Sequence, residues 1–127
     1  MTWHDEARQW LRRLFATSRR CDVEVVRERG WGSIWTVTTD TGRHWFKAAH
    51  PALRGEAALR QVLERHAGEH VVPMTAVHPG AGWFVTKDQG ATLAARETTK
   101  DSRNLAELAV AAGRIQQAVP VEDLTAL

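Results

Sequence analysis

Residues 30–47 read GWGSIWTVTTDTGRHWFK, and this stretch contains two turn signals with a β-type run after each. The glycine-containing segment 30–33 is typical of a loop. Residues 40–43 suit a tight hairpin turn, because glycine accepts the positive φ that such turns need. Residues 34–39 and 44–48 are rich in β-branched and aromatic side chains, which favour strands. The stretch therefore predicts two antiparallel strands joined by a hairpin and preceded by a glycine loop.

On both sides of this stretch the apolar pattern predicts further helices and strands. Apolar residues at steps of three and four indicate helices, and short β-branched or aromatic runs between turn residues indicate strands. We expect helices over 2–16, 53–67 and 104–119, strands over 21–29, 74–77 and 83–87, and a loop over 91–101. Five strands with hairpin connections and packed helices define an α+β fold with a five-stranded antiparallel sheet.

Composition indicates one globular domain spanning residues 1–127. The chain is 43% hydrophobic and 25% charged with a formal net charge of +2, which are ordinary values for a globular protein. Cys21 is the only cysteine, so no disulfide can form within the chain, and this fits a reducing compartment. The N-terminus is too polar for a signal peptide, and no apolar run reaches the roughly 20 residues that span a bilayer. We expect a soluble cytoplasmic protein.

Charge patterning argues against nucleic-acid and membrane partners. Basic residues alternate with acidic ones along most of the chain, as in a solvated surface. Two alternatives rest on the arginines of the N-terminal segment. Arg8, Arg12 and Arg13 opposite an apolar face would suit a membrane-surface helix. Arg12, Arg13, Arg19 and Arg20 are the nearest approach to a nucleic-acid patch.

Lys47 and Glu56 form the most informative pair of polar residues. Lys47 ends a predicted strand, and Glu56 lies in the first turn of the helix that follows. A strand lysine can neutralise phosphates, and a helix glutamate can hold its ammonium group in position. The same residues also fit an ordinary strand-end lysine and an acid favoured by the helix dipole. The glycine loop two strands earlier favours the first interpretation, because its backbone N–H groups can approach a phosphate closely.

The order of these features resembles the N-terminal lobe of the aminoglycoside phosphotransferase and choline-kinase-like group. The resemblance covers residues 21–119, and four passages carry it: 35–47, 54–59, 72–77 and 82–93. It implies a protein-kinase-like lobe that binds ATP. Within that lobe Lys47 contacts the phosphates, Glu56 anchors Lys47, a glycine loop covers the phosphates, and a hinge lies beside the adenine. The residues implied for the nucleotide are Lys47, Glu56, Gly30, Gly32, Ser33, Thr86, Lys87, Asp88 and Gln89. Val26, Trp35 and Phe46 are candidates for the adenine slot or for the core.

The resemblance also implies a domain organisation and a catalytic gap. Residues 1–20 would hold an N-terminal helix, 21–87 the sheet with helix 53–67, and 88–127 the hinge and the start of a second lobe. The family's second lobe carries a catalytic-loop Asp with a downstream Asn and a metal-binding Asp, and no passage of the 127 residues matches them. We therefore expect no catalytic or metal-binding residue in this chain, and Mg²⁺ binding only in a complete two-lobe enzyme.

Two functions follow from this gap. The first is the ATP-binding lobe of a small-molecule phosphotransferase, catalytically incomplete as this chain and completed by a C-terminal lobe. The second is a non-enzymatic protein-interaction module with a kinase-lobe fold, or a self-associating domain. A zinc site at His66 and His70 is disfavoured, because Gly68 between them should end the helix.

Overall fold

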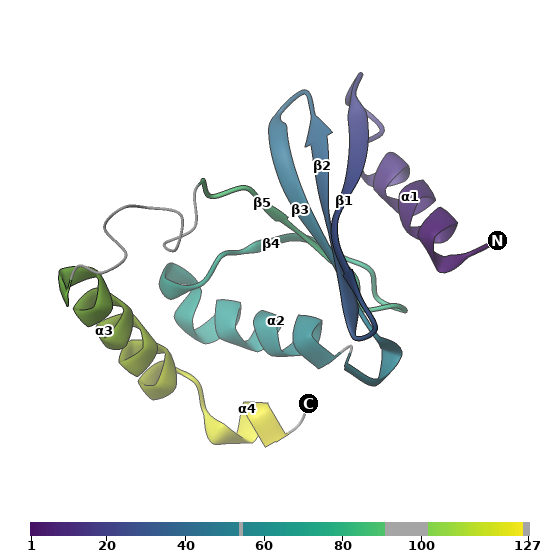
Figure 1. Ribbon diagram of the computed structural model, residues 1–127. Coiled ribbons are helices and arrows are strands. Elements are labelled where there is room, and N and C mark those ends of the chain that lie inside the picture. Colours follow the sequence, from purple (N-terminus) through teal and green to yellow (C-terminus); the bar gives the residue numbers. More distant parts are fainter. Residues whose placement is uncertain (54, 91–101, 126–127) are drawn as a thin grey trace.

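The computed structural model describes residues 1–53, 55–90 and 102–125 as an α+β fold built on one antiparallel sheet (Figure 1). The strands are β1 (Cys21–Arg29), β2 (Gly32–Thr39), β3 (Gly42–Ala49), β4 (Met74–Val77) and β5 (Phe84–Lys87). The α-helices are α1 (Trp3–Leu14), α2 (Gly55–Ala67), α3 (Ser102–Ala118) and α4 (Val121–Thr125). Short 3₁₀ turns, η1 (Pro51–Leu53) and η2 (Gly68–His70), flank α2. The α+β class and the five-stranded antiparallel sheet expected from the sequence are confirmed.

The sheet has the strand order β1-β2-β3-β5-β4. Hairpins join β1 to β2, β2 to β3 and β4 to β5, while α2 connects β3 to β4. β3 is therefore the central strand, paired with β2 on one side and β5 on the other. The side chains of β3 therefore lie between those of β2 and β5 on each face of the sheet.

The two faces of the sheet pack against different helices. Successive side chains of a strand point to opposite faces. On β3, Phe46 faces α1 and lies 6.3 Å from the ring of Trp10. The next residue, Lys47, faces α2 and reaches Glu56. Figure 1 shows α1 and α2 on opposite sides of the strands.

The main hydrophobic core lies between α1 and the sheet. Ala7 and Leu11 of α1 are fully buried there, together with aromatic and aliphatic side chains of three strands. Trp35 and Phe46 are direct cross-strand partners with ring centroids 4.7 Å apart. The members of this core are Ala7, Leu11, Trp35, Val37, Phe46, Ala48, Trp83 and Val85. Trp10 of α1 and Phe15, which follows this helix, are partly buried against this core, whereas Trp3 is 38% exposed.

Two glycines are required by the geometry of the first hairpins. Gly42 begins β3 with φ +115°, a conformation that other residues rarely adopt. A Cβ on Gly32 would lie 3.0 Å from the carbonyl oxygen of Ala48, so glycine lets β2 approach β3 closely there. The β1–β2 connection is a two-residue turn of Gly30 and Trp31.

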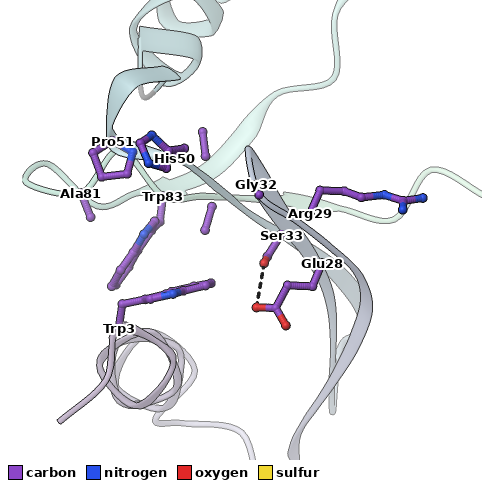
Figure 2. A pocket seen from close by; sticks show the side chains of 12 residues that line it. Trp3, Glu28, Arg29, Gly32, Ser33, His50, Pro51, Ala81 and Trp83 are labelled. Carbon is purple, nitrogen blue, oxygen red and sulfur yellow. Dashed lines mark hydrogen bonds between the residues drawn. The ribbon is translucent and has the colours of Figure 1, made fainter.

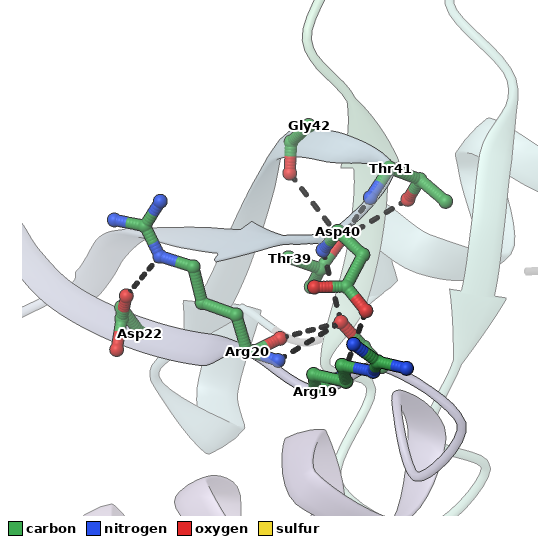
Figure 3. A network of polar contacts seen from close by, with 8 residues as sticks. Arg19, Arg20, Asp22, Thr39, Asp40, Thr41 and Gly42 are labelled. Carbon is green, nitrogen blue, oxygen red and sulfur yellow. Dashed lines mark hydrogen bonds and ion pairs between the residues drawn. The ribbon is translucent and has the colours of Figure 1, made fainter.

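A polar network ties the α1–β1 connection to the β2–β3 hairpin (Figure 3). The Arg19 N–H donates to Asp40 Oδ2 at 2.7 Å, and the Asp40 N–H donates to Ser18 Oγ at 2.9 Å. Ser18 Oγ in turn donates to the Arg20 carbonyl at 2.6 Å. Arg20 also pairs with Asp22. The contacts of Asp40 with Arg19 and Ser18 join segments about twenty residues apart.

The differences from the expected boundaries are small. The strands expected over 34–39 and 44–48 begin two residues earlier, because cross-strand pairing extends to Gly32 and Gly42. The last long helix begins at Ser102 rather than 104. After the last expected helix the chain forms the additional short helix α4. The loop expected over 91–101 lies outside the described residues. No helix in the described segments is long and apolar enough to cross a membrane.

His44 is a buried histidine on the α1 face of β3. Its Nε2 lies 3.2 Å from the hydroxyls of both Thr39 and Thr41, and the ring of Phe15 packs 4.7 Å away. Burial lowers the pKa of the His44 imidazole, and the positive charge of Lys87 lowers it further. The neutral ring is therefore favoured in the folded protein.

We expect the free energy of unfolding to decrease as the pH falls below about 6.5, the ordinary histidine pKa, because the unfolded chain then binds a proton that the folded chain resists. Urea unfolding of the wild type and of His44→Gln between pH 8 and pH 5 measures this. The substitution should flatten the pH dependence of the free energy of unfolding. Equal slopes for wild type and His44→Gln would contradict the role of His44.

Candidate functional site

The centre of the candidate site is an ion pair between Lys47 and Glu56. Lys47 Nζ lies 2.8 Å from Glu56 Oε2 and 2.9 Å from Oε1, so both carboxylate oxygens contact the ammonium group. The side chains are 37% and 32% exposed. The pair is therefore accessible from solvent while its geometry is well defined.

The fold brings together the C-terminal end of β3, which carries Lys47, and the N-terminal end of α2, which carries Glu56. Lys47 lies near the end of β3, flanked by Ile34 of β2 and Phe84 of β5 in the strand register. Glu56 lies in the first turn of α2, where the helix dipole favours a negative charge. Eight residues, 48–55, lie between them in the chain, and these include the last residues of β3 and the turn η1.

Arg60 extends the charged cluster along α2. Its Nε lies 3.7 Å from Glu56 Oε1, and its guanidinium group lies 5.0 Å from the centroid of the Phe84 ring. Glu56 is thus shared between two cations, and a positive charge remains in the cluster. This charge suits an anionic ligand such as a phosphate.

The Lys47–Glu56 pair contributes little to stability. Partly exposed ion pairs are worth about 0–1 kcal/mol, because solvent screens them and two long side chains lose freedom. What the pair does provide is orientation, since Glu56 holds the ammonium group over the α2 face of the sheet. A positioned ammonium group can bind phosphate oxygens.

The serine of the glycine loop faces away from Lys47. Ser33 is 2% exposed, pairs with Ala48, and therefore lies on the α1 face, opposite to Lys47. Its hydroxyl donates to Glu28 Oε1 at 3.2 Å. Gly30 and Gly32 bracket the exposed Trp31 at the tip of the β1–β2 hairpin. The structure does not bring the Ser33 side chain and Lys47 together.

Of the three apolar candidates for an adenine slot, two belong to the core. Trp35 and Phe46 are fully buried on the α1 face. They cannot line a slot on the Lys47 face, because side chains alternate along each strand and the sheet lies between. Val26 is 53% exposed on the edge strand β1, at an irregularity in its pairing with β2.

The expected hinge, residues 86–89, begins inside the sheet. Thr86 pairs with Trp45 of β3 and with Met74 of β4, so its backbone has strand neighbours on both sides. The Asp88 N–H donates to the Arg43 carbonyl at 3.0 Å, and the Gln89 amide donates to the Lys87 carbonyl at 3.3 Å. Backbone N–H and C=O groups that are available to a ligand would therefore belong to residues after Thr86.

Sequence reasoning missed Trp45 and Arg43 as partners of Asp88. Trp45 Nε1 donates to Asp88 Oδ1 at 2.9 Å, and Arg43 Nη2 pairs with Asp88 Oδ2 at 3.2 Å. The Arg43 guanidinium lies 5.3 Å from the centroid of the Trp45 ring. Trp45 precedes Lys47 by two residues and so shares its face, a relation that strand alternation alone could have revealed. The Trp45 hydrogen bond, followed by that of Arg43, lowers the pKa of the Asp88 carboxyl.

No group of three or more metal-binding side chains occurs in the described segments. His66, one of the two histidines considered for zinc, instead lies 2.5 Å from Asp123 Oδ2 and links α2 to α4. Near Lys47 the nearest carboxylate, that of Glu56, is already engaged by the ammonium group. These residues do not fit a magnesium site.

Comparison with known proteins adds no assignment. No protein-family model matches the chain, and no curated protein matches it. No solved structure matches it either. The site is therefore interpreted from its own geometry.

We expect the Trp45 indole N–H resonance to report the titration of Asp88. The two hydrogen-bond donors stabilise the carboxylate. The chemical shift of the Trp45 indole N–H should therefore stay constant from pH 7 down to the ordinary Asp pKa of 3.8 and change only below it. Asp88→Asn should displace the resonance already at pH 7, while that of exposed Trp31 stays unchanged. A titration midpoint at or above 3.8 would argue against the proposed contacts.

Proposed function

We propose that this chain is the ATP-binding lobe of a small-molecule phosphotransferase similar to the aminoglycoside phosphotransferase and choline-kinase-like group. The observation that carries the proposal is the Lys47–Glu56 pair, with Nζ 2.8 Å from Oε2. Protein kinases use a lysine on their third strand, paired with a glutamate on the following helix, to hold nucleotide phosphates. Here the lysine is on β3, and the glutamate is on the helix that connects β3 to β4.

The α2 face of the sheet offers a surface on which a nucleotide can be arranged. Lys47 would bind the phosphates, and the backbone of Gly30 and Gly32 at the hairpin tip would cover them. Trp45 lies on the same face, between Lys47 and the expected hinge at 86–89. The base would lie at this end, beside the backbone of Asp88 and Gln89.

Transfer itself would require groups from outside this surface. A phosphotransferase needs a residue that accepts the proton of the attacking hydroxyl, and carboxylates that hold Mg²⁺. Glu56 is engaged with Lys47 and Arg60, so it does not serve either purpose. We assign these tasks to a second lobe, and to this chain the binding and orientation of the nucleotide.

Substitution of Lys47 tests the proposal. Lys47→Ala should weaken ATP binding about tenfold or more, because a charge-assisted contact is worth about 1.5–3 kcal/mol and tenfold corresponds to about 1.4 kcal/mol. Isothermal titration calorimetry with ATP measures the affinity. Arg65→Ala is the matched control, since Arg65 is an exposed cation in the last turn of α2, at the opposite end of that helix from Glu56. Equal affinity for wild type and Lys47→Ala would refute the proposed role.

Exposed apolar side chains on α3 and α4 favour a second candidate, a self-associating or protein-binding module. Leu108 and Val110 of α3 are each 52% exposed, and Val121 of α4 is 69% exposed. A partner that covers these side chains would remove their apolar surface from water.

If this second function holds, the mass measured by light scattering should rise with protein concentration. Val110→Lys together with Val121→Lys should return it to the mass of one chain. A concentration-independent mass of about one chain for the wild type would speak against self-association.

A further inference from the structure

A cavity of about 390 Å³ opens on the α1 side of the sheet (Figure 2). Its walls come from the start of α1, the β1–β2 hairpin, the end of β3 and the β4–β5 connection. Small residues such as Gly32, Ala48 and Ala81 leave the space open, and a volume of this size suits a small molecule.

The cavity is separate from the Lys47–Glu56 site. Ser33 and Ala48, which line it, are cross-strand partners on the α1 face. Their neighbours Ile34 and Lys47 form the next pair and point to the α2 face. Neither Lys47 nor Glu56 lines the cavity. A ligand bound here would occupy the face opposite to the proposed nucleotide.

Two tryptophans form the aromatic side of the cavity. The ring centroids of Trp3 and Trp83 lie 6.3 Å apart with the planes inclined at 45°. Trp83 is 8% exposed, whereas Trp3 is 38% exposed and stacks on His4 and Trp35, with centroids 3.9 and 5.6 Å away. Figure 2 shows both indoles bordering the same space. Indole rings pack against aromatic groups and attract cations to their faces.

Glu28 supplies a carboxylate across the cavity from the two indoles, as Figure 2 shows. Its Oε1 accepts from the buried Ser33 hydroxyl at 3.2 Å and lies 2.5 Å from His4 Nε2. Both contacts use Oε1, so neither occupies the other carboxylate oxygen. The contact with His4 lowers the pKa of the Glu28 carboxyl, which keeps it ionised at neutral pH. The side chain of neighbouring Arg29 extends away from the cavity in Figure 2.

We propose that this cavity binds a small arylalkyl ammonium ion, with its aromatic ring against Trp3 and Trp83 and its ammonium group at the carboxylate of Glu28. An aromatic wall facing a fixed carboxylate is the arrangement that recognises an organic cation with an apolar body. The cavity would discriminate against neutral molecules of the same shape, because they leave the carboxylate unpaired. This site uses neither Lys47 nor Glu56 and shares only the hairpin residues around Gly30 and Gly32 with the proposed nucleotide site.

Benzylamine and benzyl alcohol form a matched pair of probes, because they have nearly the same shape and only the amine is charged at pH 7. ¹H–¹⁵N spectra of the full chain, with indole resonances assigned from single Trp→Phe variants, follow the binding. Benzylamine should shift the Trp3 and Trp83 indole resonances and leave that of Trp45 in place. Benzyl alcohol should bind about tenfold more weakly or not at all.

Glu28→Gln tests the carboxylate directly, since it preserves the shape of the side chain. It should weaken benzylamine binding about tenfold, whereas Glu24→Gln, an exposed position of the same strand, should leave the affinity unchanged. Lys47→Ala should also leave it unchanged. Equal affinity for the amine and the alcohol, equal affinity of wild type and Glu28→Gln, or shifts confined to other indoles would overturn the proposal.

Discussion

The alternation of side chains along β3 is the constraint on which the rest of the structure depends. His44, Phe46 and Ala48 point toward α1 and are buried, while Trp45 and Lys47 point toward α2 and remain partly exposed. Because β3 is the central strand, one short stretch of backbone supplies buried core residues to one face and the residues of the candidate site to the other. A shift of one residue in its register would bury the ammonium group of Lys47 and expose the ring of Phe46.

The aromatic core on the α1 face makes this arrangement possible. Trp35 and Phe46 fill the space between the sheet and α1, and burying such rings supplies much of the stability that folding requires. The stability of the protein therefore does not depend on the Lys47–Glu56 pair of the α2 face, and this pair can serve ligand binding instead. The ion pair of Lys47 and Glu56 is worth little for stability at its exposure, which is consistent with a role in orienting a ligand.

The sequence predicted the strands, the helices and their order well, because each is encoded by local patterns of apolar residues and turns. The pairing of Lys47 with Glu56 could also be predicted from the sequence, because only a short turn separates β3 from α2. The sequence could not show that Ser33 faces away from Lys47, because the face of a residue depends on register and on which helix covers the sheet. The sequence also could not predict the cavity between Trp3, Glu28 and Trp83, because only tertiary packing brings together residues so far apart in the chain.

The packing of α1 has a consequence for how the chain acquires its structure. Leu11 is buried in a cluster that includes Phe46 and Val85. Because α1 precedes the sheet in the chain, its apolar stripe cannot be covered until some seventy further residues have been synthesised. Contacts between such distant parts of a chain form slowly, and the stripe is open to wrong partners in the meantime. The apolar stripe of α1 is thus exposed to aggregation until β5 has been made.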